Sequence, residues 1–60
     1  MARYKVLSEV YIPGIGTCKH EHEQEFDEEL NVFGRALEYH KYMYKTFPKC
    51  DFRLIKAEAV

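Results

Sequence analysis

The sequence predicts a small α+β domain with the element order ββαβ, in which one helix packs on one face of a three-stranded antiparallel sheet. Three patterns along the 60 residues support this fold class. Polar and apolar residues alternate near the start, a helical period follows in the middle, and a strand pattern returns at the end. A chain of this length can bury only one hydrophobic core, so residues 1–60 are expected to form a single domain. The size also argues against an enzyme with separate cofactor and substrate lobes.

The first two strands are expected to form a hairpin. Residues 3–12 alternate, and one face of this strand carries Tyr4, Val6, Ser8, Val10 and Ile12. The segment 13–16 contains a proline and two glycines, which favours a turn. Alternation resumes over residues 17–25 in a polar register, which predicts a second strand despite its low content of strand-favouring residues.

A helix is predicted from about residue 27 to residue 46. Apolar side chains recur at helical spacing in a main stripe of Phe26, Leu30, Phe33, Leu37, His40 or Lys41, Tyr44 and Phe47. A flanking stripe widens this face with Val32, Ala36, Tyr39 and Met43. The acidic run at 27–29 is expected to open the helix, as the helix dipole favours, and Pro48 is expected to end it. Gly34 is expected where the helix approaches the sheet. Tyr39, Met43 and Tyr44 are expected near the core, which leaves Tyr42 pointing outward.

The last strand is predicted over residues 50–59, with Phe52 and Leu54 on one face and Arg53, Ile55 and Ala57 on the other. Because the helix returns the chain, this strand runs parallel to the second strand and antiparallel to the first. The sheet is entirely antiparallel only if the first strand lies in the middle, which gives the strand order 2-1-3. The first strand is also the most apolar of the three, as a central strand should be.

The spacing Cys18-x-His20-x-His22 is the sharpest candidate for a metal site, because alternate residues of a strand share one face. Zinc binds cysteine and histidine, and His40 or Cys50 could supply a fourth ligand. Three ligands along one strand span about 13 Å, however, so a pair such as His20 and His22 fits one ion better than all three. The alternative is that these residues form the less apolar face of a strand that the helix partly covers.

The two cysteines are expected to be free thiols in a reducing cytoplasm, because the opening residues contain no apolar stretch typical of a secretory signal. In the order 2-1-3, Cys18 and Cys50 lie two strand spacings apart, about 9.5 Å. That separation exceeds the limit of about 7 Å between the Cα atoms of a disulfide.

An acidic stretch marks the second strand and the segment after it: Glu21, Glu23, Glu25, Asp27, Glu28 and Glu29. The three strand glutamates share one face at intervals of about 6.6 Å, which suits a basic partner surface or partial mimicry of a nucleic-acid backbone. Edge protection is by itself a sufficient explanation and is the favoured one, because the second strand is an edge in the order 2-1-3 and charged residues on an edge strand discourage aggregation between sheets.

The overall charge argues against nucleic acid as the partner, and the lack of a long apolar run argues against a membrane. The chain has a formal net charge of −1 and a pI near 6.3, whereas nucleic-acid-binding domains are usually strongly basic. A nucleic-acid binder could still use the cations Arg35, Lys41, Lys45, Lys49, Arg53 and Lys56. No apolar run reaches the length of about 18 residues that a membrane-spanning helix needs.

The layout resembles the short α+β accessory proteins encoded by bacteriophages and prophages. The resemblance covers the whole chain: Met-Ala-Arg-Tyr-Lys-Val at residues 1–6 opens into a strand, and an acidic helix start follows. Thr46-Phe47-Pro48 then precedes the terminal strand Phe52-Arg53-Leu54-Ile55-Lys56. Members of that class with known roles are mostly inhibitors or modulators of host machinery, anti-CRISPR proteins among them, so the resemblance implies a similar role without assigning any residue.

The expected function is therefore that of a non-enzymatic binding protein that masks a surface of a host protein or nucleoprotein complex. The residues expected to contact the partner lie on the acidic strand and the helix: Glu21, Glu23, Glu25, Glu28, Glu38, Tyr42 and Lys45. Two alternatives remain open. One is a mini-domain stabilised by zinc through Cys18, His20, His22 and His40, and the other is a small structural or regulatory homodimer.

Overall fold

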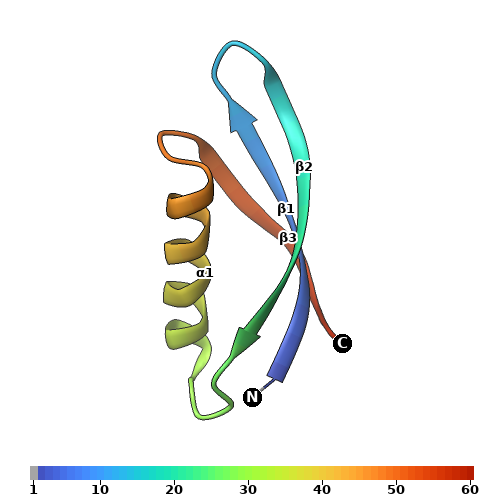
Figure 1. Cartoon of the computed structure of the whole chain (residues 1–60), viewed down its shortest axis with the longest axis vertical. Helices are drawn as coiled ribbons and strands as arrows, with labels where there is room; N and C mark the ends of the chain where they lie inside the picture. The colour runs from blue at the N-terminus through green and yellow to red at the C-terminus, as the bar shows by residue number, and fades with distance from the viewer. Residues whose placement is uncertain (1) are drawn as a thin grey trace.

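A computed structural model describes residues 2–60 as three strands and one helix (Figure 1). The elements follow the order β1 (Ala2–Ile12), β2 (Gly16–Phe26), α1 (Val32–Thr46) and β3 (Asp51–Ala59). Both neighbours of β1 run antiparallel to it, and the strand order is β2-β1-β3. The predicted ββαβ fold class, the antiparallel sheet and the central position of the first strand are therefore confirmed.

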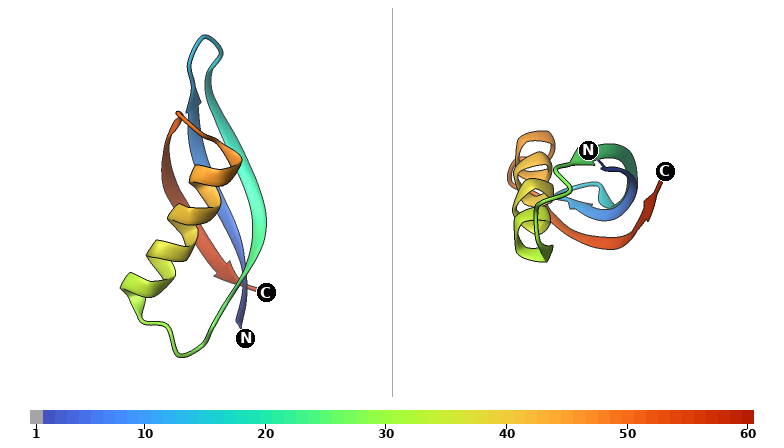
Figure 2. Two further views of the ribbon diagram at one scale, coloured as in Figure 1. Left: turned by 60° about the vertical axis from the view of Figure 1, so that its left-hand side comes forward. Right: turned by 90° about the horizontal axis from the view of Figure 1, so that it is seen from below.

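The helix covers one face of a strongly curved sheet, and the hairpin of β1 and β2 extends beyond it (Figures 1 and 2). The molecule is elongated, with extents of 39 × 19 × 14 Å. At the hairpin tip, Gly14 and Gly16 have positive φ angles, which only glycine adopts without strain. Within residues 2–60, no helix combines the length and the apolar character that crossing a membrane requires.

The pairing of β1 with β2 is regular, but β3 contains an irregularity. Leu7 pairs with Lys56 and Ser8 pairs with Leu54, so Ile55 is an additional residue in β3. Beyond this bulge Ala57 pairs with Val6, on the face that carries α1. The prediction that Ala57 lies opposite to Leu54 is therefore wrong, because one inserted residue exchanges the two faces of a strand.

The helix begins at Val32, about five residues later than predicted, because local side chains stabilise a turn before it. The Asp27 carboxylate accepts a hydrogen bond from the Glu29 amide at 3.0 Å. Asn31 is the N-cap, and its side-chain oxygen accepts from the Gly34 amide at 2.8 Å. The acidic run thus precedes the helix instead of forming its first turn.

Gly34 is not at a close approach to the sheet. A Cβ atom added there would lie 2.9 Å from Leu30 Cδ2 and 3.5 Å from Asn31 Oδ1, so its close neighbours belong to the segment that enters the helix. The expected reason for this glycine is therefore wrong.

The helix buries only one side of the apolar face that the sequence predicts. Its two buried residues, Tyr39 and Met43, are expected near the core and belong to the flanking stripe, whereas Tyr44, which is also expected there, is 61% exposed. Two further members of the main stripe are solvent-exposed as well, at 80% for Phe33 and 63% for Leu37. Helical periodicity identifies apolar faces, and here two such faces lie side by side on one helix.

The core is small and consists of Val6 and Val10 of β1 packed against Tyr39 and Met43 of α1. Ser8 lies between the two valines and is also fully buried. Its hydroxyl forms a hydrogen bond of 2.7 Å with the Tyr39 hydroxyl, which satisfies the polar atoms of both side chains inside the core.

Candidate functional site

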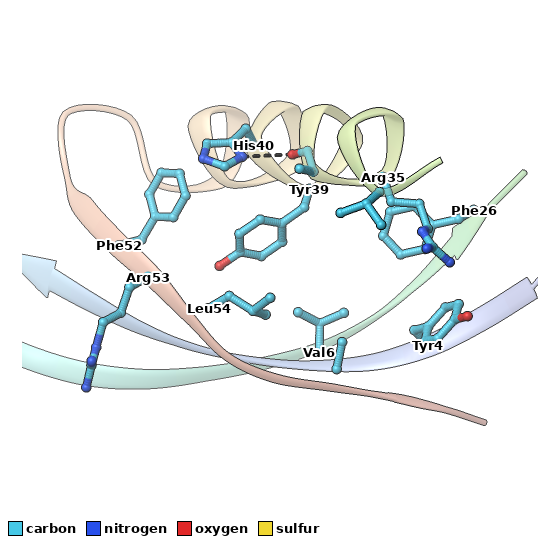
Figure 3. A pocket seen from close by; sticks show the side chains of 12 residues that line it. Tyr4, Val6, Phe26, Arg35, Tyr39, His40, Phe52, Arg53 and Leu54 are labelled. Carbon is cyan, nitrogen blue, oxygen red and sulfur yellow. Dashed lines mark hydrogen bonds between the residues drawn. The ribbon is translucent and has the colours of Figure 1, made fainter. Parts of the chain in front are cut away.

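A groove of about 470 Å³ runs between α1 and β3 (Figure 3). It exists because the two flanks of the helix are covered differently. On the β2 flank, the Tyr42 ring stacks on His22 with a centroid separation of 3.8 Å. On the β3 flank, Leu54 faces the helix side of the sheet yet remains 50% exposed.

The groove is mainly apolar. Its floor includes Val6 of β1 with Leu54 and Ala57 of β3, and α1 contributes Ala36 and Tyr39. Two alanines among these residues leave space that larger side chains would fill. Tyr4 and Phe26 lie at one end of the groove, and Phe52 and His40 lie at the other (Figure 3).

The charged residues that line the groove are all basic. They are Arg35 and Arg53, and the lining contains no aspartate or glutamate. The Arg53 side chain points away from the groove in Figure 3, and its Nε donates to Glu9 at 3.3 Å. His40 also contributes to the lining, and its Nδ1 donates to the Ala36 carbonyl oxygen at 2.7 Å.

Arg35 is the one cation of the groove whose side chain has no partner among residues 2–60. Its side chain is partly buried and descends from α1 beside Phe26 (Figure 3). Its backbone amide donates to the Asn31 carbonyl oxygen, so the N-cap residue also holds the backbone of Arg35 in place. The guanidinium group has five N–H donors in a planar arrangement that matches a carboxylate.

An exposed apolar stripe adjoins the groove along α1. Phe33, Leu37 and Tyr44 follow the i, i+4, i+11 spacing, so they share one face of the helix. Tyr44 contacts Phe52 with a centroid separation of 5.3 Å, and the His40 ring lies 5.4 Å from Phe52. The stripe therefore continues into the wall of the groove at its Phe52 end.

The structure does not bring the four predicted zinc ligands together. His20 and His22 stack with a centroid separation of 5.4 Å on the β2 flank, whereas His40 packs on Phe52 of β3. Cys18 is exposed, and both cysteines are free thiols. Within residues 2–60, no group of three or more histidine, cysteine, aspartate or glutamate residues is placed to hold a metal ion.

The two strand histidines instead complete the packing of the β2 flank. The His22 Nε2 atom donates to Gln24 Oε1 at 2.9 Å, and its buried Nδ1 atom has no hydrogen-bond partner in the described chain. His20 contacts Phe47 and lies 3.3 Å from the Tyr42 hydroxyl. Burial lowers the pKa of His20 below 6.5, and the charge of His22 lowers it further.

The acidic strand is paired with the neighbouring basic residues of β1. Arg3 contacts Glu23 at 3.2 Å and Glu25 at 3.6 Å, and Lys5 contacts Glu21 at 3.6 Å. These pairs are exposed and lie on the face of the sheet away from α1. The glutamates therefore form an ion-paired network with β1, in which two cations offset most of their three negative charges, instead of an isolated negative edge.

The remaining predicted contact residues lie apart from one another. Glu28 is in the turn before α1, Glu38 pairs with Lys41 at 3.5 Å, and Lys45 is exposed in the last helical turn. Tyr42 does not point outward as expected, because it is half-buried against His22. The exposed tyrosine of this segment is Tyr44.

Comparison with protein-family models, curated proteins and solved structures finds no match to this chain. The roles of its residues must therefore be argued from the chain's own geometry.

Sequence reasoning did not predict the groove, nor that Arg35 lines it without a partner among residues 2–60. One signal was available, since Arg35 is a lone cation among the residues Val32, Ala36 and Tyr39 that share a helical face. The sequence did not predict that Ala57 faces α1, because nothing in the local sequence marks the bulge in β3.

Proposed function

We propose that this protein is a non-enzymatic binding protein of the phage type, which inhibits or modulates a protein or nucleoprotein complex in the bacterial cytoplasm. The observation that supports this proposal is the exposed stripe of Phe33, Leu37 and Tyr44. Aromatic residues are enriched at the centres of protein interfaces, and exposed apolar side chains gathered along one face of a helix are typical of a binding surface.

The available area is consistent with such a contact. The whole chain exposes 4611 Å², and a standard interface buries about 800 Å² on each partner. The stripe alone is smaller than that, so a partner would also cover neighbouring surface. The apolar wall of the groove on one side and Lys41 and Lys45 on the other would form the periphery of the contact.

The acidic strand has a secondary role in this proposal. Because Arg3 and Lys5 already pair with Glu21, Glu23 and Glu25, a basic partner would have to displace those contacts. Exposed pairs of this kind contribute more to the rate and specificity of association than to affinity. We assign the anchoring role to the helix stripe and a guiding role to the strand.

The test is capture of partners from a bacterial lysate by tagged protein, followed by reconstitution with the purified partner. The variant Phe33→Glu should lower the affinity for that partner at least tenfold, because an exposed ring central to an interface would be replaced by a charge. The matched control is Ile15→Glu, since Ile15 is 75% exposed at the hairpin tip, away from α1.

Circular dichroism of both variants establishes that the fold is retained. Equal binding by the Phe33→Glu and Ile15→Glu proteins would remove the helix stripe from the proposal. If Glu21→Lys with Glu23→Lys abolished capture while Phe33→Glu did not, the acidic strand would be the anchor instead.

A homodimer is the second candidate, because the same stripe could cover its equivalent on another copy. Light scattering over a dilution series distinguishes the two functions. A dimer that the Phe33→Glu substitution dissociates would identify the stripe as a self-association surface, and a monomer at all concentrations would exclude this candidate.

A further inference from the structure

We infer that the groove between α1 and β3 binds a monocarboxylate with a linear apolar chain, of the fatty-acid type. In this arrangement the carboxylate pairs with Arg35, and the chain lies along Val6, Leu54 and Ala57. The inference does not rest on the proposed function, because the stripe of Phe33, Leu37 and Tyr44 lies outside this groove.

The charge of the groove selects an anion. The chain as a whole has a net charge of −1, yet the lining of the groove contains no carboxylate, and Arg35 is its one arginine that is not paired with a described carboxylate. Arg35 is partly buried and its guanidinium has no hydrogen bond or ion pair with any described residue. A guanidinium held beside apolar surface gains most from a carboxylate, which it can bind through two parallel hydrogen bonds.

Within the described chain, the groove has one cation that is free to bind a ligand, so it fits a ligand with a single negative charge. Arg53 is paired with Glu9 on the far face of the sheet, and the Nδ1 atom of His40 donates to the Ala36 carbonyl oxygen. Arg35 is thus the one fully available cation of the groove. A polyphosphate or a nucleic-acid backbone would leave further charges without partners.

The shape and the lining select an apolar chain. A volume of about 470 Å³ lies within the range of about 300–1,000 Å³ that is usual for small-molecule sites. The groove extends from Tyr4 and Phe26 to Phe52, and Leu54 lies between these ends (Figure 3). An extended chain can cover this length, and its burial would remove the exposed half of Leu54 from water.

The experiment is a titration of the full chain with dodecanoate below its micellar concentration, followed by calorimetry and by amide chemical shifts. Dodecanoate should bind with one-to-one stoichiometry, and the shifts should concentrate at Arg35, Leu54 and Ala57. Decanoate, which is two methylenes shorter, should bind about fifteenfold more weakly, because each buried methylene changes the affinity about fourfold.

The charge requirement is tested first on the unmodified chain, so that no variant has to fold. Dodecanol and dodecyltrimethylammonium have the same alkyl chain without the carboxylate, and both should bind at least tenfold more weakly than dodecanoate. Equal binding of dodecanol would overturn the inference, because Arg35 would then contribute nothing.

Substitutions at Arg35 test whether this residue supplies the positive charge that binds the carboxylate. Arg35→Gln should weaken dodecanoate binding about tenfold or more, and Arg35→Lys should restore part of the loss. The matched control Lys45→Gln removes an exposed cation of the same helix outside the groove and should leave the affinity unchanged. Binding of dodecanoate must also survive the Phe33→Glu substitution, which separates this site from the protein-binding stripe.

A second copy of the chain is the competing occupant. If the amide shifts that dodecanoate causes lie outside the groove, the inference is wrong. It is also wrong if dimerisation itself shifts the amides of Leu54 and Ala57 and saturating dodecanoate does not dissociate that dimer.

Discussion

The two flanks of the helix differ, although the same few turns of α1 form both. On the β2 flank, Tyr42, His20 and His22 stack closely and leave little surface to fill. On the β3 flank, Leu54 stays half-exposed beside a groove. The difference shows that this chain uses its large aromatic residues to close one side of a thin core and leaves the other side accessible.

The comparison separates residues that stabilise the fold from residues that are available for binding. A 60-residue chain with one small core has little stability to spare. Substitutions on the closed flank and in the core should therefore lower the free energy of unfolding strongly, and substitutions on the open flank should change binding with little effect on folding.

The largest effect is expected for Met43→Ala. Met43 is fully buried against Val6 and Val10, and its truncation should lower the free energy of unfolding by about 2–5 kcal/mol. That loss is comparable to the whole stability of a small domain, so urea unfolding followed by circular dichroism should show a largely unfolded variant at 25 °C.

The matched substitution on the open flank is Leu54→Ala. Because half of this side chain is already in water, the loss should stay below about 1 kcal/mol. Equal losses for Met43→Ala and Leu54→Ala would contradict the distinction between the flanks.

The next effect concerns the hydrogen bond in the core between Ser8 and Tyr39. The variant Tyr39→Phe leaves the buried Ser8 hydroxyl without its side-chain partner and should lower the free energy of unfolding by about 1–3 kcal/mol. Adding Ser8→Ala to that variant should cost less than the same substitution costs alone. Strict additivity in this double-mutant cycle, measured by urea unfolding, would show that the two hydroxyls do not interact.

A smaller effect is the pH dependence that His20 gives to the closed flank. The pKa of His20 is lowered in the folded chain, chiefly by burial and also by His22, so the unfolded chain binds protons more readily. The stability that comes from neutral His20 is fully present above pH 6.5 and is lost as the pH falls through the lower folded pKa.

The measurement for His20 is thermal unfolding at pH values from 7.5 to about 5.5, above the range where exposed carboxylates titrate. The midpoint should decrease with falling pH in the unmodified chain and decrease less in His20→Gln. Proton NMR of the imidazole provides a direct check, since a His20 midpoint at or above 6.5 would exclude this mechanism.

The smallest effect is expected on the sheet face away from α1. In Glu23→Gln, Arg3 keeps its contact with Glu25, and exposed ion pairs contribute little, so the free energy of unfolding should change by less than about 0.5 kcal/mol. Urea unfolding at low and high salt measures this. A loss as large as that for Tyr39→Phe would give the acidic strand a structural role that its exposure does not suggest.

The strand order could be predicted from the sequence because chain direction left few choices. The helix must return the chain, and only a central first strand makes every pair antiparallel, as the pairing of β1 with both β2 and β3 confirms. The helix start could not be located by periodicity, because the Asp27 side chain stabilises a turn and Asn31 provides the cap.

The candidate site was less accessible to sequence reasoning than the fold. Two apolar stripes compete on α1, and only packing decides that Tyr39 and Met43 are buried while Phe33 and Leu37 are exposed. The acidic residues were evident in the sequence, but their pairing with β1 depends on the register. The groove depends on side chains from three elements and on a bulge, none of which a local pattern reveals.

The additional residue in β3 decides which side chains can line the groove. In an unbroken strand that continued from Leu54, alternation would turn Lys56 and Glu58 toward α1, where Ala57 and Ala59 now lie. Deletion of Ile55 would remove the bulge and still leave Ala57 and Ala59 toward α1, because alternation from Leu54 would again place them on that face. A single-codon deletion at this position would therefore straighten the strand and keep the groove open, while the order of the strands stayed the same.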